Sequence, residues 1–181
     1  MESDEVHGGN LSVPLAYNNS VAGVSEVTVN TSDLAIGSDW TRGAPETLVL
    51  WYYGDPANAA TERMYVKING VKVDYPGDAA DITRPIWKQW NIDLTALGIH
   101  LGNVTQLSIV FERIGISGGS GMVLFDDIRL YRSAPSVASE AIWLESEAAI
   151  TQGPIWQTEE DIAAPGGRSC VSGYWAESAN R

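Results

Sequence analysis

The sequence has 181 residues, of which 44% are apolar, and it carries a formal net charge of −12 at pH 7. Nucleic acids and anionic membranes both require a basic surface, so the charge argues against either as a partner. The one cysteine, Cys170, excludes an internal disulfide and a CxxC metal site.

The sequence contains no stretch close to the ~20 apolar residues that a membrane-spanning helix needs. The acidic start, MESDEVHGG, lacks the apolar core of a signal peptide. Two interpretations therefore stay open: a cytoplasmic protein, or a portion of a larger secreted parent.

Short strand signals follow one another along the chain, and helical periodicity is nearly absent. Pro14 marks the first strand, Leu11–Tyr17, as bent or as an edge strand. Ser25–Thr31 alternates between apolar and polar residues. Glu46–Gly54 strongly favours a strand, but its two faces are both apolar, so the face that meets solvent stays open.

The segment Arg63–Tyr75 predicts a β-hairpin. Two alternating runs flank Asn69-Gly70, the pair that favours a tight type I′ turn. Three more strands are then expected: Ile86–Leu94, Gln106–Arg113 and Gly121–Tyr131.

About eight short strands without intervening helices predict an all-β fold, a two-sheet antiparallel β-sandwich. A closed barrel gives the same local signals. The varied strand lengths and irregular loops favour the sandwich.

The strand Gly121–Tyr131 carries two adjacent carboxylates. Under strict alternation, Asp126 shares the apolar side with Leu124 and Ile128, and Asp127 lies on the other side. We therefore expect Asp126 to point inward, where a lone carboxylate is costly unless it is paired, hydrogen-bonded or bound to a metal.

Several partners could satisfy the Asp126 carboxylate. It could accept hydrogen bonds from backbone amides, pair with Arg129 or Arg113, or bind a cation.

Several aromatic residues are candidates for sugar contact, because sugars stack on aromatic rings while planar polar groups bind their hydroxyls. Trp87 shares a strand face with Gln89 and is expected to be exposed, whereas Trp90 is expected in the core. Tyr65 is also expected to be exposed. The predicted sugar-binding residues are Trp87, Tyr65, Trp51, Tyr53 and Gln89.

The sequence gives little support for an enzyme. Neither His7 nor His100 lies in a nucleophile motif with Ser or Cys. No second acid shares a clear pattern with Glu112, and glycoside hydrolysis needs two carboxylates that face one bond. We therefore expect a non-catalytic protein.

The segments LVLWYYGDPAN, MYVKING, WKQWNIDL and GGSGMVLFDDIRLY, in this order, resemble a known class of module. They are similar to the non-catalytic, carbohydrate-binding-type β-sandwich (jelly-roll) modules of large secreted bacterial polysaccharide-degrading proteins. The similarity covers roughly residues 7–131. It implies an extracellular location within a larger parent, and a polysaccharide or oligosaccharide as ligand.

The resemblance also implies a structural Ca²⁺ near the closing strand. Asp126 and Asp127 are the expected ligands, and Glu5 could assist them. Glu145 or Glu147 could contribute if the C-terminal segment docks. The alternative of another class is a structural or interaction module that spaces domains on an exported protein and binds no sugar.

The chain changes character after Tyr131. We expect a β-sandwich over residues 1–133, a small, polar linker over 134–142, and a partial second module or a completing strand over 143–181. HGGNLSVPLAY and PGGRSCVSGYW align at one offset, as the opening of a second module would.

Modules of this class usually begin with a further acidic strand, which MESDEV is too short to supply. A bare sheet edge invites pairing with another strand. Ala141–Ala149 could fill the gap within the chain or, by strand exchange, in a homodimer.

Overall fold

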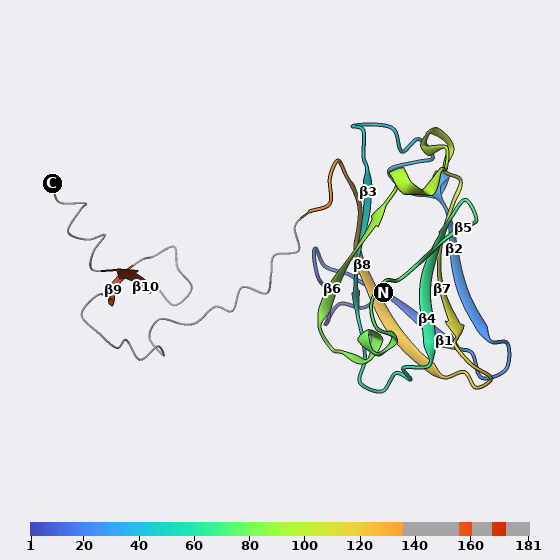
Figure 1. Ribbon diagram of the computed structural model, residues 1–181, viewed down its shortest axis with the longest axis horizontal. Helices are drawn as coiled ribbons and strands as arrows, with labels where there is room; N and C mark the ends of the chain where they lie inside the picture. Colours follow the sequence, from blue (N-terminus) through green and yellow to red (C-terminus); the bar gives the residue numbers. More distant parts are fainter. Residues whose placement is uncertain (136–155, 161–167, 173–181) are drawn as a thin grey trace. The chain divides into compact units, whose positions relative to one another are not determined.

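The chain forms two four-stranded antiparallel sheets in the computed structural model, which describes residues 1–135, 156–160 and 168–172. One sheet has the order β1-β8-β3-β6 and the other β2-β7-β4-β5. The strands are β1 Val13–Asn18, β2 Val24–Asn30, β3 Thr47–Tyr53, β4 Glu62–Ile68, β5 Val71–Asp74, β6 Trp87–Asp93, β7 Gln106–Arg113 and β8 Ser120–Tyr131. In Figure 1 the sheets form two facing layers.

This strand order is that of a jelly roll, in which eight strands are shared between two sheets. The predicted all-β, two-sheet antiparallel sandwich is confirmed, and the closed barrel is not formed, because each sheet ends at two edge strands. β1 is an edge strand, as Pro14 predicted. The described loops contain short 3₁₀ helices: η1 Thr31–Asp33, η2 Ala79–Thr83, η3 Thr95–Leu97 and η4 Leu101–Asn103.

The core lies between the sheets because alternate residues of each strand point inward. Trp90 is 2% exposed and belongs to this core, as its strand face predicted. Other core side chains are Leu15 and Tyr17 of β1, Leu48, Leu50 and Tyr52 of β3, Met64, Val66 and Ile68 of β4, and Val123 and Phe125 of β8.

The hairpin between β4 and β5 turns at Asn69-Gly70. Both residues have positive φ angles, 49° and 81°, as a type I′ turn requires. The Asn69 side chain also accepts a hydrogen bond from the backbone N–H of Thr105 at 2.7 Å, which ties the turn to the start of β7.

A β-bulge interrupts β8. Trp51 of β3 pairs with Asp126, and Val49 pairs with Arg129, so β8 contains one residue more than β3 between the two pairs. Asp127 lies in the bulge with a φ of 45°, a left-handed conformation that aspartate tolerates better than most residues. The bulge therefore lets two consecutive carboxylates face the same side of the sheet.

The remainder of the chain, Val137–Arg181, is a second unit. Its described part consists of two antiparallel strands, β9 Trp156–Glu160 and β10 Arg168–Ser172. The predicted linker, the segment Ala141–Ala149, and Glu145 and Glu147 fall outside the described residues, apart from the first two linker positions.

Candidate functional site

The outer face of the β1-β8-β3-β6 sheet carries most of the predicted sugar-binding residues. Leu50 and Tyr52 of β3 point into the core, so Trp51 and Tyr53 point outward. The pairing of β3 with β6 sets Tyr53 opposite Trp87 and Trp51 opposite Gln89. The fold thus gathers four of the five predicted residues on one surface.

Trp87 and Tyr53 form an aromatic pair on this face. Their ring centroids are 5.4 Å apart with an angle of 51° between the ring planes, and both side chains are partly exposed. Burial, followed by the negative charge of Glu5, raises the pKa of the Tyr53 hydroxyl.

Two amide side chains of β6 lie beside the aromatic pair. Gln89 Nε2 donates to Asn91 Oδ1 at 2.6 Å, and both amide nitrogens lie 3.4 Å from the carbonyl oxygen of Pro135. The chain that leaves β8 therefore contacts these amides, so their donors are partly engaged.

The N-terminal segment crosses the same face. The backbone groups of Glu2 and Ser12 exchange two hydrogen bonds of 3.0 and 2.9 Å, which closes residues 3–11 into a loop. His7, within this loop, stacks on Trp51 with ring centroids 3.8 Å apart and an interplanar angle of 18°. Trp51 is therefore covered by the chain itself.

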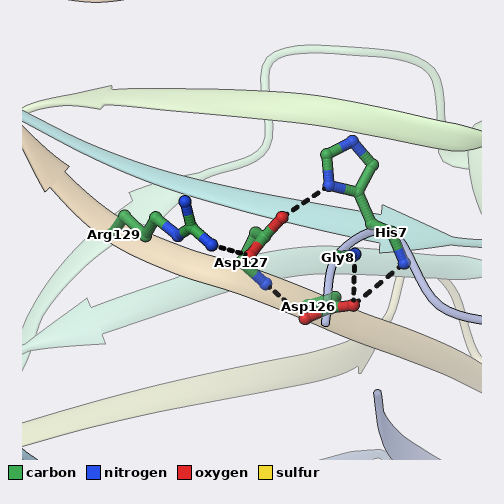
Figure 2. A network of polar contacts seen from close by, with 5 residues as sticks. All are labelled: His7, Gly8, Asp126, Asp127 and Arg129. Carbon is green, nitrogen blue, oxygen red and sulfur yellow. Dashed lines mark hydrogen bonds and ion pairs between the residues drawn. The ribbon is translucent and has the colours of Figure 1, made fainter. Parts of the chain in front are cut away.

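Asp126 holds this loop on the sheet. Its Oδ2 accepts hydrogen bonds from the backbone N–H of His7 at 2.9 Å and of Gly8 at 3.1 Å, and its Oδ1 from the N–H of Asp127 at 2.7 Å (Figure 2). Burial alone would raise the pKa of Asp126, but the hydrogen bonds from these amides outweigh it and lower the pKa below its usual value.

Asp127 joins the loop to β8. One of its oxygens lies 2.7 Å from Nδ1 of His7, and the other accepts a hydrogen bond from the Arg129 guanidinium (Figure 2). The expectation that Asp126 points inward and Asp127 lies on the opposite face is wrong. It took the face of Leu124 and Ile128 as the inward one, whereas Val123 and Phe125 point into the core, so Asp126 points outward with Trp51. The bulge that follows brings Asp127 to the same side.

Asp126 and Asp127 have few free oxygen lone pairs with which to bind a cation. Among the described residues, no group of three or more His, Cys, Asp or Glu is placed to hold a metal ion. The donors on Asp126 and Asp127 are N–H groups and a guanidinium, which take the lone pairs that Ca²⁺ would need. The arrangement matches the amide-capping role that the sequence left open for Asp126.

Tyr65 lies on the other sheet. It points away from the core, as predicted, but it is only 6% exposed, so the expected exposure is wrong. Lys72 covers it, with Nζ 3.9 Å from the ring centroid, and Lys67 lies near the same ring. Long cationic side chains cover apolar surface in this way while their charges stay in water. Tyr65 cannot join the aromatic face that Trp87 forms.

Sequence analysis missed His7 and Gly8 as parts of this surface. A Cβ on Gly8 would lie 2.5 Å from Oδ2 of Asp127, so only a glycine lets the loop approach the carboxylate while the carboxylate keeps its present position. The two glycines after His7 were the available signal that the chain approaches another part of the molecule there. They could not show that this part is Asp127, because the two residues lie 120 positions apart in the chain.

No protein-family model matches the sequence, and no curated protein matches it. Among solved structures, the chain is similar to a crystal structure described as a non-crystalline cellulose specific carbohydrate-binding module, CBM28. The identity is 18%, the TM-score is 0.47, and the match covers 72% of this chain and 80% of that chain.

The described residues contain no helix long and apolar enough to cross a membrane.

Proposed function

We propose that the protein is a non-catalytic module that binds a polysaccharide or oligosaccharide on the outer face of the β1-β8-β3-β6 sheet. The observation that supports this most directly is the partly exposed pair of Trp87 and Tyr53, with the amides of Gln89 and Asn91 beside it. Aromatic rings offer stacking area, and planar amides offer matched donors and acceptors for hydroxyls.

The proposal includes export as part of a larger protein, the setting in which a binding module delivers a partner domain to a polysaccharide. A negatively charged surface suits a neutral glycan, which has no charge for the protein to repel. It also includes the absence of catalysis. Asp126 and Asp127 are the paired carboxylates on this face, and hydrogen-bond donors engage them both.

The test is retardation in native gels that contain hydroxyethylcellulose, xylan, galactomannan or starch, followed by calorimetry with the glycan that binds. Trp87→Ala should abolish retardation or weaken binding about tenfold or more, since it removes the open stacking surface. Trp87→Phe keeps an aromatic ring and should retain part of the affinity. Circular dichroism checks that each variant is folded.

Tyr65→Leu is the matched control, because Tyr65 lies on the opposite sheet under Lys72. It should bind as the wild type does. Equal binding by wild type and Trp87→Ala would contradict the proposed site, and a lack of binding to every glycan would contradict the proposed function.

A second candidate function is a spacer module without a sugar ligand. Two contacts within the chain favour it, because they cover part of the same face. His7 stacks on Trp51, and the carbonyl oxygen of Pro135 contacts the Gln89 amide. The gel experiment separates the two, because a spacer would run unretarded through every glycan.

Structural Ca²⁺ bound by Asp126 and Asp127 remains part of the proposal. A cation there would have to replace the N–H groups of His7 and Gly8. If Ca²⁺ binds, a concentration of 100 times Kd should add about 2.7 kcal/mol to the free energy of unfolding. Thermal unfolding in calcium and in EDTA measures this gain, which Asp126→Asn should remove. An unchanged Tm would contradict the calcium site.

A further inference from the structure

We propose that His7 occupies a saccharide subsite on Trp51 and so sets the length of ligand that the aromatic face accepts. The inference rests on the proposed function and deepens it. In this view the face has an open part, formed by Trp87 and Tyr53, and a closed part at Trp51 that the chain fills with its own imidazole ring.

The ring geometry at Trp51 supports this assignment. The imidazole lies nearly parallel to the indole, at an angle of 18°, with the centroids 3.8 Å apart. Aromatic side-chain pairs more often adopt offset or edge-to-face arrangements at 4.5–7 Å. A flat ring stacked on an indole at the outer face of a sheet has the pose that a stacked pyranose would take.

The imidazole is held in this place from two directions. Asp127 contacts its Nδ1 at 2.7 Å, and Asp126 accepts the backbone N–H groups of His7 and Gly8 (Figure 2). The side chain of Asp127 is only 16% exposed, although it lies on the outer face of the sheet. Several contacts therefore fix the imidazole on Trp51, and a ligand that stacks on Trp51 must displace the imidazole.

Gly8 makes the close approach of the loop possible. A Cβ at this position would lie 2.5 and 3.0 Å from the two carboxylate oxygens of Asp127. An alanine would force either the Asp127 carboxylate or the loop to shift, and either shift would disturb the contact that holds the imidazole on the indole. Gly8 thus offers a second way to open Trp51 that leaves the His7 side chain intact.

The open and closed parts adjoin one another. The His7 ring also meets Trp87 edge-on, with centroids 5.7 Å apart. A short ligand stacked on Trp87 would therefore end against the imidazole. A longer ligand gains the Trp51 surface only when the imidazole leaves, so His7 should weaken binding of long oligosaccharides more than of short ones.

The experiment compares wild type, His7→Ala and Gly8→Ala by calorimetry, with oligosaccharides of two to six units cut from the polysaccharide that retards the protein. If no polysaccharide retards the wild type, the variants are run on the same four-glycan panel. Both variants should bind the longer oligosaccharides about 2- to 10-fold tighter and the disaccharide unchanged. Gly115→Ala is the control, because a Cβ there meets nothing within 4 Å.

A second measurement does not depend on any glycan. The indole Nε1–H signal of Trp51 in the NMR spectrum, assigned by its loss in Trp51→Phe, should shift in His7→Ala and Gly8→Ala and stay in place in Gly115→Ala. An unchanged signal in His7→Ala would overturn the stacked arrangement itself.

The outcomes separate this inference from the function on which it rests. If Trp87→Ala loses binding while His7→Ala binds long oligosaccharides no more tightly than wild type, the self-occupied subsite is wrong and the proposed function stands. Weaker binding by His7→Ala would make the imidazole a ligand contact and also overturn the inference. If neither wild type nor the variants bind any glycan, the proposed function and the inference both fail.

Discussion

Some side chains on the outer face of the β1-β8-β3-β6 sheet, where we propose that a ligand binds, make hydrogen bonds to other parts of the chain. Asp126 illustrates this, because its carboxylate is the acceptor for backbone groups about 120 positions away. Hydrogen bonds to an ionised acceptor are roughly twice as strong as neutral ones. The charge of Asp126 therefore matters to the N-terminal loop, which covers Trp51.

Asp126→Asn keeps the shape of the side chain and removes its charge. We expect it to lower the free energy of unfolding at pH 7 by about 1 kcal/mol, because charge-assisted hydrogen bonds from the amides become neutral ones. The pKa of Asp126 is depressed in the folded protein, so its contribution is present above the unfolded value of about 3.9 and is lost as the pH falls through the folded pKa.

Urea unfolding at pH 7 and pH 3 measures this difference. The difference in the free energy of unfolding between wild type and Asp126→Asn should be about 1 kcal/mol at pH 7 and smaller at pH 3. Asp4→Asn, at an exposed position of the same loop, is the control and should show little gap at either pH. An equal gap at both pH values would contradict the role of the charge.

Strand β8 shows how one element decides the arrangement of a surface. Without the bulge, strict alternation beyond Asp126 would turn Ile128 outward and Arg129 inward. With the extra residue at Asp127, Arg129 pairs with Val49 on the outer face and Leu130 pairs with Leu48 on the inner face. The bulge thus reconciles two carboxylates on the surface with an apolar strand end over the core.

Two single-residue deletions test this account of β8. Deletion of Asp127 should remove the extra residue and leave every other β8 side chain on its present face, at a cost of about 1–2 kcal/mol from lost contacts to His7 and Arg129. Deletion of Ile128 should instead move Asp127 to the position that Ile128 now holds, which is 42% exposed and lines an apolar pocket. The carboxylate would lose His7 and Arg129 there and would be partly desolvated beside apolar side chains, so this deletion should cost more than the first. Thermal unfolding of the two variants should show the lower Tm for the second. Similar Tm values would contradict the bulge assignment.

Within residues 1–135, strand β8 of the sandwich extends beyond its edge-side partner β1. β1 pairs with residues 120–125 of β8, and β8 continues to Tyr131. An unpaired strand edge is a template for another strand. Pairing with Ala141–Ala149, in a homodimer formed by strand exchange, stays a prediction because that segment lies outside the described residues.

The oligomeric state tests strand exchange. The full chain should have a dimer mass by size exclusion with light scattering, and the dimer should dissociate on dilution. A chain of residues 1–136 keeps Pro135, which contacts Gln89 and Asn91, and it should remain a monomer. A full chain that is monomeric at every concentration, with the stability of the shorter chain, would contradict the exchange.

Local sequence patterns determined the all-β class, the bounds of the strands to within about two residues, the Asn69-Gly70 turn and the burial of Trp90. These features depend on alternation and turn chemistry between near neighbours. The same patterns indicated Trp87 as an outward aromatic residue.

Only the tertiary structure decided the rest. Strand pairing joined Trp51, Tyr53 and Trp87 on one face, the bulge brought Asp127 to the same face as Asp126, and the N-terminal loop covered Trp51 with His7. These features depend on contacts between residues distant in the chain, and alternation within one strand carries no information about them.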